Sequence, residues 1–147
     1  MVGCDGAALP QFSNSITGQI VGVHDGDSCT LLTEAKEQYK IRLDGIDAPE
    51  LGQPQGRQGK ATLSDLVMSR QVTVQDKGKD RYGRTLGVVM VNGQNANLEM
   101  VRLGYAWHYL KYSKDNALAK AEKEARADKR GLWADASPVP PWDWRRK

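Results

Sequence analysis

The chain has 147 residues, with 21 Lys and Arg against 18 Asp and Glu, which gives a formal net charge of +3. This length suits one domain with its own hydrophobic core. No apolar run approaches membrane-spanning length, and the first four residues have neither the basic nor the apolar region of a signal peptide, so we expect a soluble chain without a membrane-spanning segment. We also expect a monomer.

The charge is unevenly distributed along the chain. No Lys or Arg occurs before Lys36, and four acids stand alone there, whereas 21 basic and 14 acidic residues follow from Lys36 onward. A basic body with an acidic pocket suits a polyanion bound through a metal ion. An ordinary solvated surface accounts for the charge alone equally well.

A polar arm is expected up to about Ser15, followed by strands at 17–24 and 28–33 joined by an Asp-Gly-Asp hairpin turn at 25–27. Cys29 alternates with the apolar positions of the second strand, which predicts a small buried residue. A Cys4–Cys29 disulfide and lipidation of Cys4 are the alternatives.

The third strand is predicted by the alternation of residues 37–44. Its apolar side chains, Tyr39, Ile41 and Leu43, share one face. Arg42 therefore points away from the core.

A turn follows this strand and carries an unusual density of charged side chains. Gly45 and Pro49 break the strand, so Asp47 and Glu50 can converge on something bound above the sheet, while Pro49 favours an extended Ala48. Two carboxylates and a carbonyl suit a hard cation such as Ca²⁺. A surface turn with solvated acids is the alternative.

The later elements follow from periodicity, capping residues and Gly or Pro breaks. We expect a helix at 57–69, a strand at 71–75, a charged loop at 76–84, a strand at 85–91, a helix at 97–103 and a helix at 116–129 capped by Asp115. Five short strands with helices inserted predict an α+β protein: a five-stranded OB-fold β-barrel with three packed α-helices.

The domain organisation expected is a flexible arm at 1–15, the barrel domain at 16–136 and an extended tail at 137–147. Trp142 and Trp144 should hold the tail on the core. Arg145, Arg146 and Lys147 could contact phosphate, but a frayed charged terminus is the expectation.

Five motifs, in this order and at similar spacings, resemble the staphylococcal nuclease (thermonuclease) family. They are Asp25-Gly-Asp27, the segment 42–50, Asp80-Arg-Tyr-Gly-Arg84, the segment 97–106 and Lys129-Arg-Gly-Leu-Trp133. The resemblance implies an OB-fold and a Ca²⁺-dependent nuclease that cuts DNA and RNA with little sequence preference and leaves 3′-phosphate ends.

The resemblance also implies residue roles. Asp27, Asp47 and the main-chain carbonyl of Ala48 match the calcium ligands, although the family often has Thr at this last position. Glu50 matches the general base, and Arg42 and Arg84 match the phosphate-binding arginines. The nucleotide-contacting tyrosines correspond to Tyr82, Tyr109 and Tyr112, with a looser alignment at Tyr109.

Phosphodiester hydrolysis needs such groups on chemical grounds. A metal ion neutralises a phosphoryl oxygen, a carboxylate orients or deprotonates water, and planar guanidinium groups hold equatorial oxygens better than lysine would.

Plainer roles stay open for several of these residues. Arg84 could begin a strand and pair with Asp80, the three tyrosines could be packing residues, and both histidines are expected to be structural. The competing functional class is a non-catalytic OB-fold nucleic-acid-binding module. Export to the periplasm or medium is expected, with an intracellular role tied to mobile DNA as the alternative.

Overall fold

A computed structural model describes residues 14–146, so most of the predicted arm, with Cys4 and its two hypotheses, lies outside the described residues. The strands are β2 (Ser15–Asp25), β3 (Ser28–Leu32), β4 (Gln38–Leu43), β5 (Ile46–Asp47), β6 (Gln71–Lys79), β7 (Thr85–Val91), β8 (Gln94–Asn95) and β9 (Trp107–His108). The helices are α1 (Gly56–Val67), α2 (Ala96–Arg102), α3 (Asn116–Ala127), a 3₁₀ helix (Gly131–Ala134) and α4 (Pro141–Trp144).

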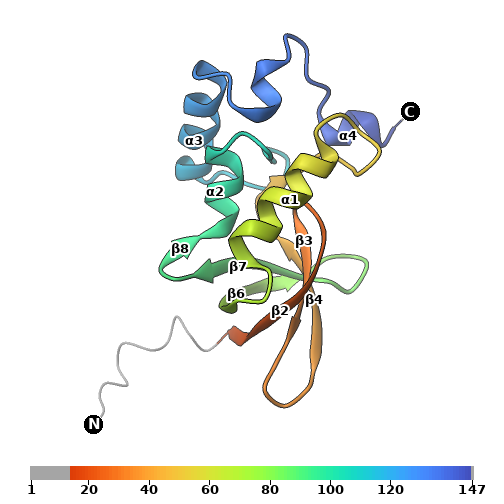
Figure 1. Cartoon of the computed structure of the whole chain (residues 1–147), viewed down its shortest axis with the longest axis vertical. Helices are drawn as coiled ribbons and strands as arrows, with labels where there is room; N and C mark the ends of the chain where they lie inside the picture. Colours follow the sequence, from red (N-terminus) through yellow and green to blue (C-terminus); the bar gives the residue numbers. More distant parts are fainter. Residues whose placement is uncertain (1–13, 147) are drawn as a thin grey trace.

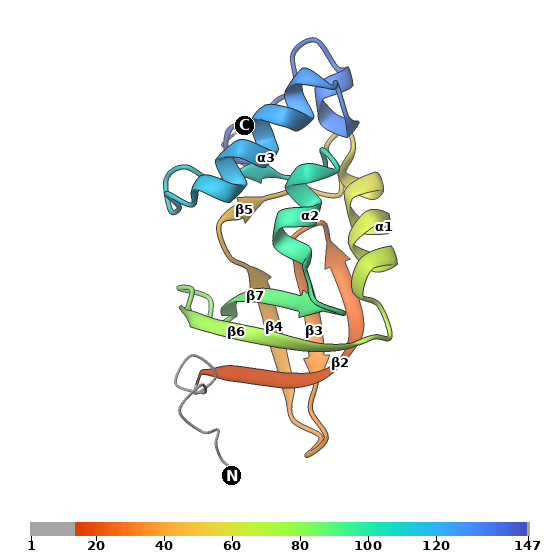
Figure 2. The same ribbon diagram turned by 90° about the vertical axis from the view of Figure 1, so that its left-hand side faces the viewer.

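Five of these strands close into a barrel (Figure 2). Neighbours run in the order β4-β3-β2-β6-β7, and β4 returns to β7 through a parallel pairing that places Ile41 opposite Thr85 and Leu43 opposite Gly87. The predicted five-stranded OB-fold is therefore confirmed. The parallel pairing also fixes the end of β4, where the acidic turn begins, next to the start of β7.

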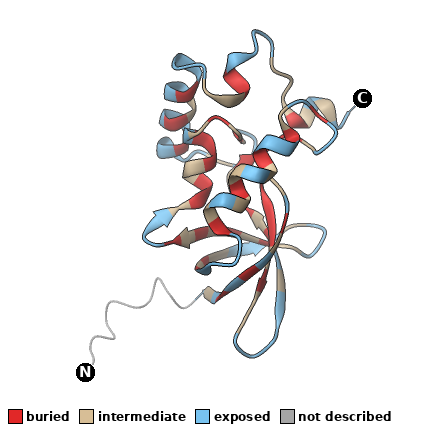
Figure 3. Cartoon of the chain, viewed as in Figure 1, coloured by how far each residue is buried: buried red, intermediate tan, exposed pale blue. Residues whose placement is uncertain are grey.

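Strand alternation fills the barrel interior, as the sequence predicts. Ile20, Leu31, Ile41 and Val89 are fully buried, and buried positions alternate with more exposed ones along β7 (Figure 3). Cys29 is also buried, and it is a free thiol. The core reading of Cys29 is thus correct.

Helices cover one end of the barrel (Figure 1). α1 buries Leu63 and Val67 against the barrel core, and α3 begins where the Asp115 carboxylate accepts hydrogen bonds from the amides of Ala117 and Leu118. This cap satisfies amide groups that the helix itself leaves unpaired. The three predicted helices are present, and none of the helices described is long and apolar enough to cross a membrane.

Two sequence expectations are wrong in detail. β6 continues to Lys79, where a loop was expected from 76, because its end pairs across a register shift with β7 and Gly78 adopts a positive φ of 117°. The tail is not wholly extended either, since residues 141–144 form α4. Proline is well suited to a first helical turn, and Pro141 is buried there.

A second apolar cluster lies between α3 and the tail. Trp107, Leu132 and Trp133 are buried in it, and Trp142 of α4 packs against it. The docking of Leu132 and Trp133 is as expected, and Trp142 attaches the tail to this cluster.

Candidate active site

The β2–β3 turn presents Asp27. The Asp25 carboxylate caps this turn by accepting hydrogen bonds from the Asp27 amide, at 3.0 Å, and from the Ser28 hydroxyl, at 2.8 Å. Gly26 allows a close approach, because a Cβ atom built on it would lie 2.8 Å from Cβ of Ala48. The turn therefore needs glycine in the middle, and Asp25 acts by shaping it.

Arg42 is locked in place at the end of β4. One terminal nitrogen, Nη1, donates to the carbonyls of Leu43, at 2.7 Å, and Ile46, at 2.9 Å. The other, Nη2, lies 3.4 Å from Asp27 Oδ2 and 3.3 Å from Asp47 Oδ1. Two carboxylates from distant turns thus converge on a single nitrogen atom.

Asp47 is fully buried, which is unusual for a carboxylate, and it lies in the short strand β5. Antiparallel pairing with β9 sets Asp47 opposite Trp107. The neighbouring Ala48 donates its amide hydrogen to Asp27 Oδ2 at 2.7 Å. Ala48 is buried and does not line the cavity described below.

Glu50 lies on the loop that leads into α1, and its side chain is 39% exposed. Gln53 holds this loop: its Oε1 accepts from the Glu50 amide at 3.1 Å, and its Nε2 donates to the Val139 carbonyl at 2.6 Å. The buried amide of Gln53 therefore ties the Glu50 loop to the tail.

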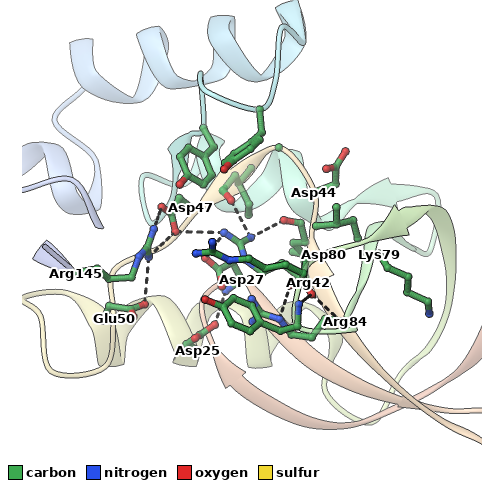
Figure 4. Close-up of a pocket in the computed structure, with 18 residues that line it drawn as sticks. Asp25, Asp27, Arg42, Asp44, Asp47, Glu50, Lys79, Asp80, Arg84 and Arg145 are labelled. Atoms are coloured by element: carbon green, nitrogen blue, oxygen red, sulfur yellow. Dashed lines mark hydrogen bonds and ion pairs between the residues drawn. The ribbon is translucent and has the colours of Figure 1, made fainter. Parts of the chain in front are cut away.

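One cavity of about 680 Å³ collects these groups (Figure 4). Eight of the nine sequence-predicted site residues line it, and Ala48 is the exception. The eight are Asp27, Arg42, Asp47, Glu50, Tyr82, Arg84, Tyr109 and Tyr112.

Arg84 enters the cavity from the start of β7. Its Nε donates to Asp80 Oδ2 at 2.7 Å, and its amide donates to the other oxygen of the same carboxylate. The pairing with Asp80 is therefore real, but it engages only one side-chain nitrogen, and the two terminal nitrogens have no hydrogen-bond partner among residues 14–146. The pairing orients Arg84 and leaves it able to bind an anion.

The tyrosines differ in exposure. Tyr82 and Tyr112 are 71% and 66% exposed, whereas Tyr109 is half-buried. The Tyr109 ring contacts Tyr112 edge-on, at 4.9 Å between ring centroids. Solvent-facing rings at the rim of a charged cavity are suited to stacking with bases.

Arg145, for which the sequence offered a phosphate contact only as the lesser alternative, reaches the cavity from the end of α4. Its Nη2 donates to Asp47 Oδ2 at 2.6 Å, its Nη1 donates to Oδ1 at 3.2 Å, and Nη1 lies 3.6 Å from Glu50 Oε2 (Figure 4). The expected frayed terminus is wrong for this residue. The only sequence signal was the tryptophan three positions earlier, which anchors the tail.

The charged groups influence one another through burial and proximity. Burial raises the pKa of the Asp27 carboxyl well above its usual range, while Arg42 opposes that effect and Asp25 adds to it. Burial also acts to raise the pKa of Asp25, but hydrogen bonds with Asp27 and Ser28 outweigh it and the pKa falls. Hydrogen bonds to Asp47 raise the pKa of Arg145, which therefore stays charged.

The donor set fits a hard divalent cation. Asp27 and Asp47 offer oxygens close enough to share one guanidinium nitrogen, and carboxylate oxygen is the donor that Ca²⁺ and Mg²⁺ prefer. No group of three or more His, Cys, Asp or Glu side chains that could hold a metal occurs within the described residues. Main-chain, water and phosphate oxygens would have to complete the coordination.

The two histidines play no part in this cavity. His24 Nε2 hydrogen-bonds the Thr30 hydroxyl at 2.7 Å, and His108 Nε2 hydrogen-bonds the Ser113 hydroxyl at 2.9 Å. Both are satisfied by neighbouring hydroxyl groups, as a structural role predicts.

Comparison with known proteins identifies the family of this chain. A profile of the family described as staphylococcal nuclease homologue matches residues 40–135, which is well over half of the chain. The chain belongs to the staphylococcal nuclease family. A protein of Haemophilus influenzae named as an uncharacterized endonuclease is 49% identical over 131 residues, covering 89% of this chain and 74% of that protein.

Two further relatives are similar to the present chain over most of its length. An uncharacterized endonuclease of Escherichia coli O157:H7 is 45% identical over 139 residues, covering 94% of this chain and 90% of its own. The micrococcal nuclease of Shigella flexneri is 42% identical over 140 residues, covering 88% and 80%. The family and the names of these relatives support nuclease activity, with nucleic acid as the substrate.

Proposed function

We propose that the chain is a Ca²⁺-dependent endonuclease that hydrolyses DNA and RNA phosphodiester bonds with little sequence preference and leaves 3′-phosphate ends. The observation that carries the proposal is the convergence of Asp27 and Asp47 on one point of a cavity that Glu50, Arg42 and Arg84 also line.

The metal would be held by the Asp27 and Asp47 carboxylates, with the Ala48 carbonyl as a main-chain ligand. When bound, the cation would neutralise a phosphoryl oxygen and position a water molecule. An all-oxygen donor set supports a hard cation over zinc or copper.

Glu50 is assigned the role of base or water-orienting group. Its carboxylate is partly exposed, so it can accept a proton from a water molecule in the cavity. As the water oxygen bonds to phosphorus, the bond from phosphorus to the 5′ oxygen breaks. That oxygen takes a proton from solvent, which gives a 5′-hydroxyl and a 3′-phosphate.

Arg42 and Arg84 are assigned the role of stabilising the negative charge that builds up on the phosphoryl oxygens. Arg42 is preorganised by two main-chain carbonyls, and Arg84 is oriented by Asp80 with its terminal nitrogens unengaged. Fixed donors of this kind stabilise a transition state without having to reorganise during the reaction. We assign to Tyr82, Tyr109 and Tyr112 the role of contacting the nucleotides on either side of the phosphate that is cut.

Export to the periplasm or medium is part of the proposal, because an unspecific nuclease endangers the nucleic acids of its host. A monomeric state is also proposed, since one chain supplies every group of the site. Cell fractionation and sedimentation of the purified protein test these two points.

The test is cleavage of single-stranded DNA and RNA with Ca²⁺, with EDTA, and by the Glu50→Gln variant, with identification of the new ends. Glu37→Gln is the matched control, because Glu37 is exposed and does not line the cavity. Ca²⁺-dependent cutting to 3′-phosphates that only Glu50→Gln abolishes is the expected result. Binding without cutting, indifferent to EDTA, would instead identify a non-catalytic binding module.

A further inference from the structure

A second cavity of about 430 Å³ lies beside the first and shares Tyr109 and Arg145 with it. Its lining consists of two aromatic and three basic side chains and includes no carboxylate. They are Tyr109, Lys111, Trp142, Arg145 and Arg146, and we call this surface the tail groove.

The aromatic wall of the tail groove is held by packing. The Trp142 ring lies parallel to that of Tyr109, with centroids 5.3 Å apart and 5° between the planes, and it meets Trp107 edge-on at 5.3 Å. Pro141 is buried, and the Gln53 side chain holds the main chain at Val139. The tail is therefore fixed against the catalytic domain.

The two outer cations of the groove are weakly engaged. Arg146 is 81% exposed and meets Asp143 at a long 3.8 Å. Lys111 is exposed, and its ammonium group lies 5.4 Å from the centroid of the Tyr112 ring. Both can turn toward an external phosphate at little cost, since an exposed ion pair or an exposed contact between a cation and a ring holds a side chain only weakly.

We propose that the tail groove binds the single-stranded part of the nucleic acid substrate beyond the phosphate that is cut. This inference rests on the proposed nuclease function and extends its site to the tail. Lys111 and Arg146 would contact backbone phosphates, and an unpaired base would pack against the Tyr109–Trp142 pair. A basic groove with aromatic rings is how proteins bind single strands without reading their sequence.

The tail groove is continuous with the first cavity, and this favours a substrate strand over another polyanion as its ligand. Tyr109 lines both cavities, so a strand whose scissile phosphate lies near Arg42 can continue past Tyr109 into the groove. A paired base is stacked inside its duplex and cannot use the aromatic pair in this way. The groove should therefore act on single strands.

The test compares a trinucleotide with a single strand of about 16 nucleotides, a length within the range that small binding folds cover. The double variant Lys111→Ala/Arg146→Ala is measured against Lys120→Ala/Lys123→Ala, which removes two exposed cations of α3 that line neither cavity. Cleavage gives kcat/KM, and binding of the longer strand is measured in a Glu50→Gln background across a range of salt concentrations.

The groove variant is expected to lose about tenfold in kcat/KM and affinity on the longer strand, with the trinucleotide unchanged. Its plot of log affinity against log salt should become shallower by about 1.4, since each phosphate contact on a single strand contributes about 0.7. The control pair should show neither effect.

Equal losses on both lengths, no loss on the longer strand, or losses matched by the control pair would each overturn the inference. In those cases the unmodified protein still cuts, so the proposed function stands. If the unmodified protein cuts no substrate, the proposed function fails first, and the two failures are distinguishable.

Discussion

The guanidinium of Arg145 and the carboxylate of Asp47 form a two-point contact, at 2.6 and 3.2 Å, between residues 98 positions apart in the chain. We also assign Asp47 as a ligand of the proposed metal ion. With the metal assigned to Asp47, the divalent cation would compete with the positive charge of Arg145 for the same carboxylate.

Replacing Arg145 with methionine should therefore tighten Ca²⁺ binding. A charged hydrogen bond contributes about 1.5–3 kcal/mol, and partial exposure of Arg145 places the effect at the low end, about tenfold in Kd. Isothermal titration with Ca²⁺ measures it. Arg146→Met, which leaves both hydrogen bonds to Asp47 intact, should bind Ca²⁺ as the parent does, and unchanged or weaker binding by Arg145→Met would refute the competition.

Lysine should be a poor substitute for Arg84. A single ammonium group cannot bond Asp80 and also present two further planar donors to a phosphate, so kcat should fall by about 10²–10³. The melting temperature should change little, because the Arg84 side chain is partly exposed. The comparison is with Arg102→Lys, on the exposed side of α2, and comparable kcat values for the two variants would count against the assigned role.

Alanine at position 26 should disturb the acidic turn. Its Cβ atom would lie 2.8 Å from Cβ of Ala48 and 3.3 Å from the main chain of Gly59, and such overpacking costs about 1–3 kcal/mol in the free energy of unfolding. Ca²⁺ affinity should also fall, since Asp27 and Ala48 must move apart. Gly52→Ala is a close control, because no atom lies within 4 Å of a Cβ there. Urea denaturation and Ca²⁺ titration of both variants provide the measurement.

The stability of the protein should decline at alkaline pH through Cys29. Burial raises the pKa of this thiol to about 12, whereas an unfolded cysteine ionises near about 8.5. Since the unfolded chain releases this proton first, the contribution of Cys29 is complete below about pH 8.5 and is lost as the pH rises toward about 12.

Denaturant unfolding at about pH 8 and about pH 10 detects this loss. Cys4→Ser, which retains Cys29, should be destabilised more by the rise in pH than Cys4→Ser/Cys29→Ala. The same Cys4→Ser protein should react with a thiol reagent only after unfolding. Rapid labelling of the native protein would show that Cys29 is accessible.

Local patterns account for most of what the sequence could predict. β7 begins and ends where its alternation does, at Thr85 and Val91, and α3 begins directly after the Asp115 cap. In both cases residues a few positions apart determine the structure, so the local sequence pattern is enough to predict where the element begins.

The errors occur where distant contacts decide the structure. Residues 76–79 are charged and contain glycine, but β7 supplies hydrogen-bonding partners that extend the strand. The docking of Arg145 depends on a ring contact between Trp142 and Tyr109 and on a buried carboxylate early in the chain. No spacing within the last ten residues contains that information.

The parallel pairing of β4 with β7 also has a consequence for how the protein is made. This pairing sets Arg42 opposite Leu86, two positions after Arg84, and its strands are separated by more than forty positions of sequence. Until Val91 has left the ribosome, a chain in translation contains the acidic turn but lacks a complete β7. The pairing of β4 with β7 that sets Arg84 near this turn therefore cannot form. Synthesis from the N-terminus therefore delays assembly of the catalytic groups until most of the domain has left the ribosome, whose own RNA is among the substrates proposed here.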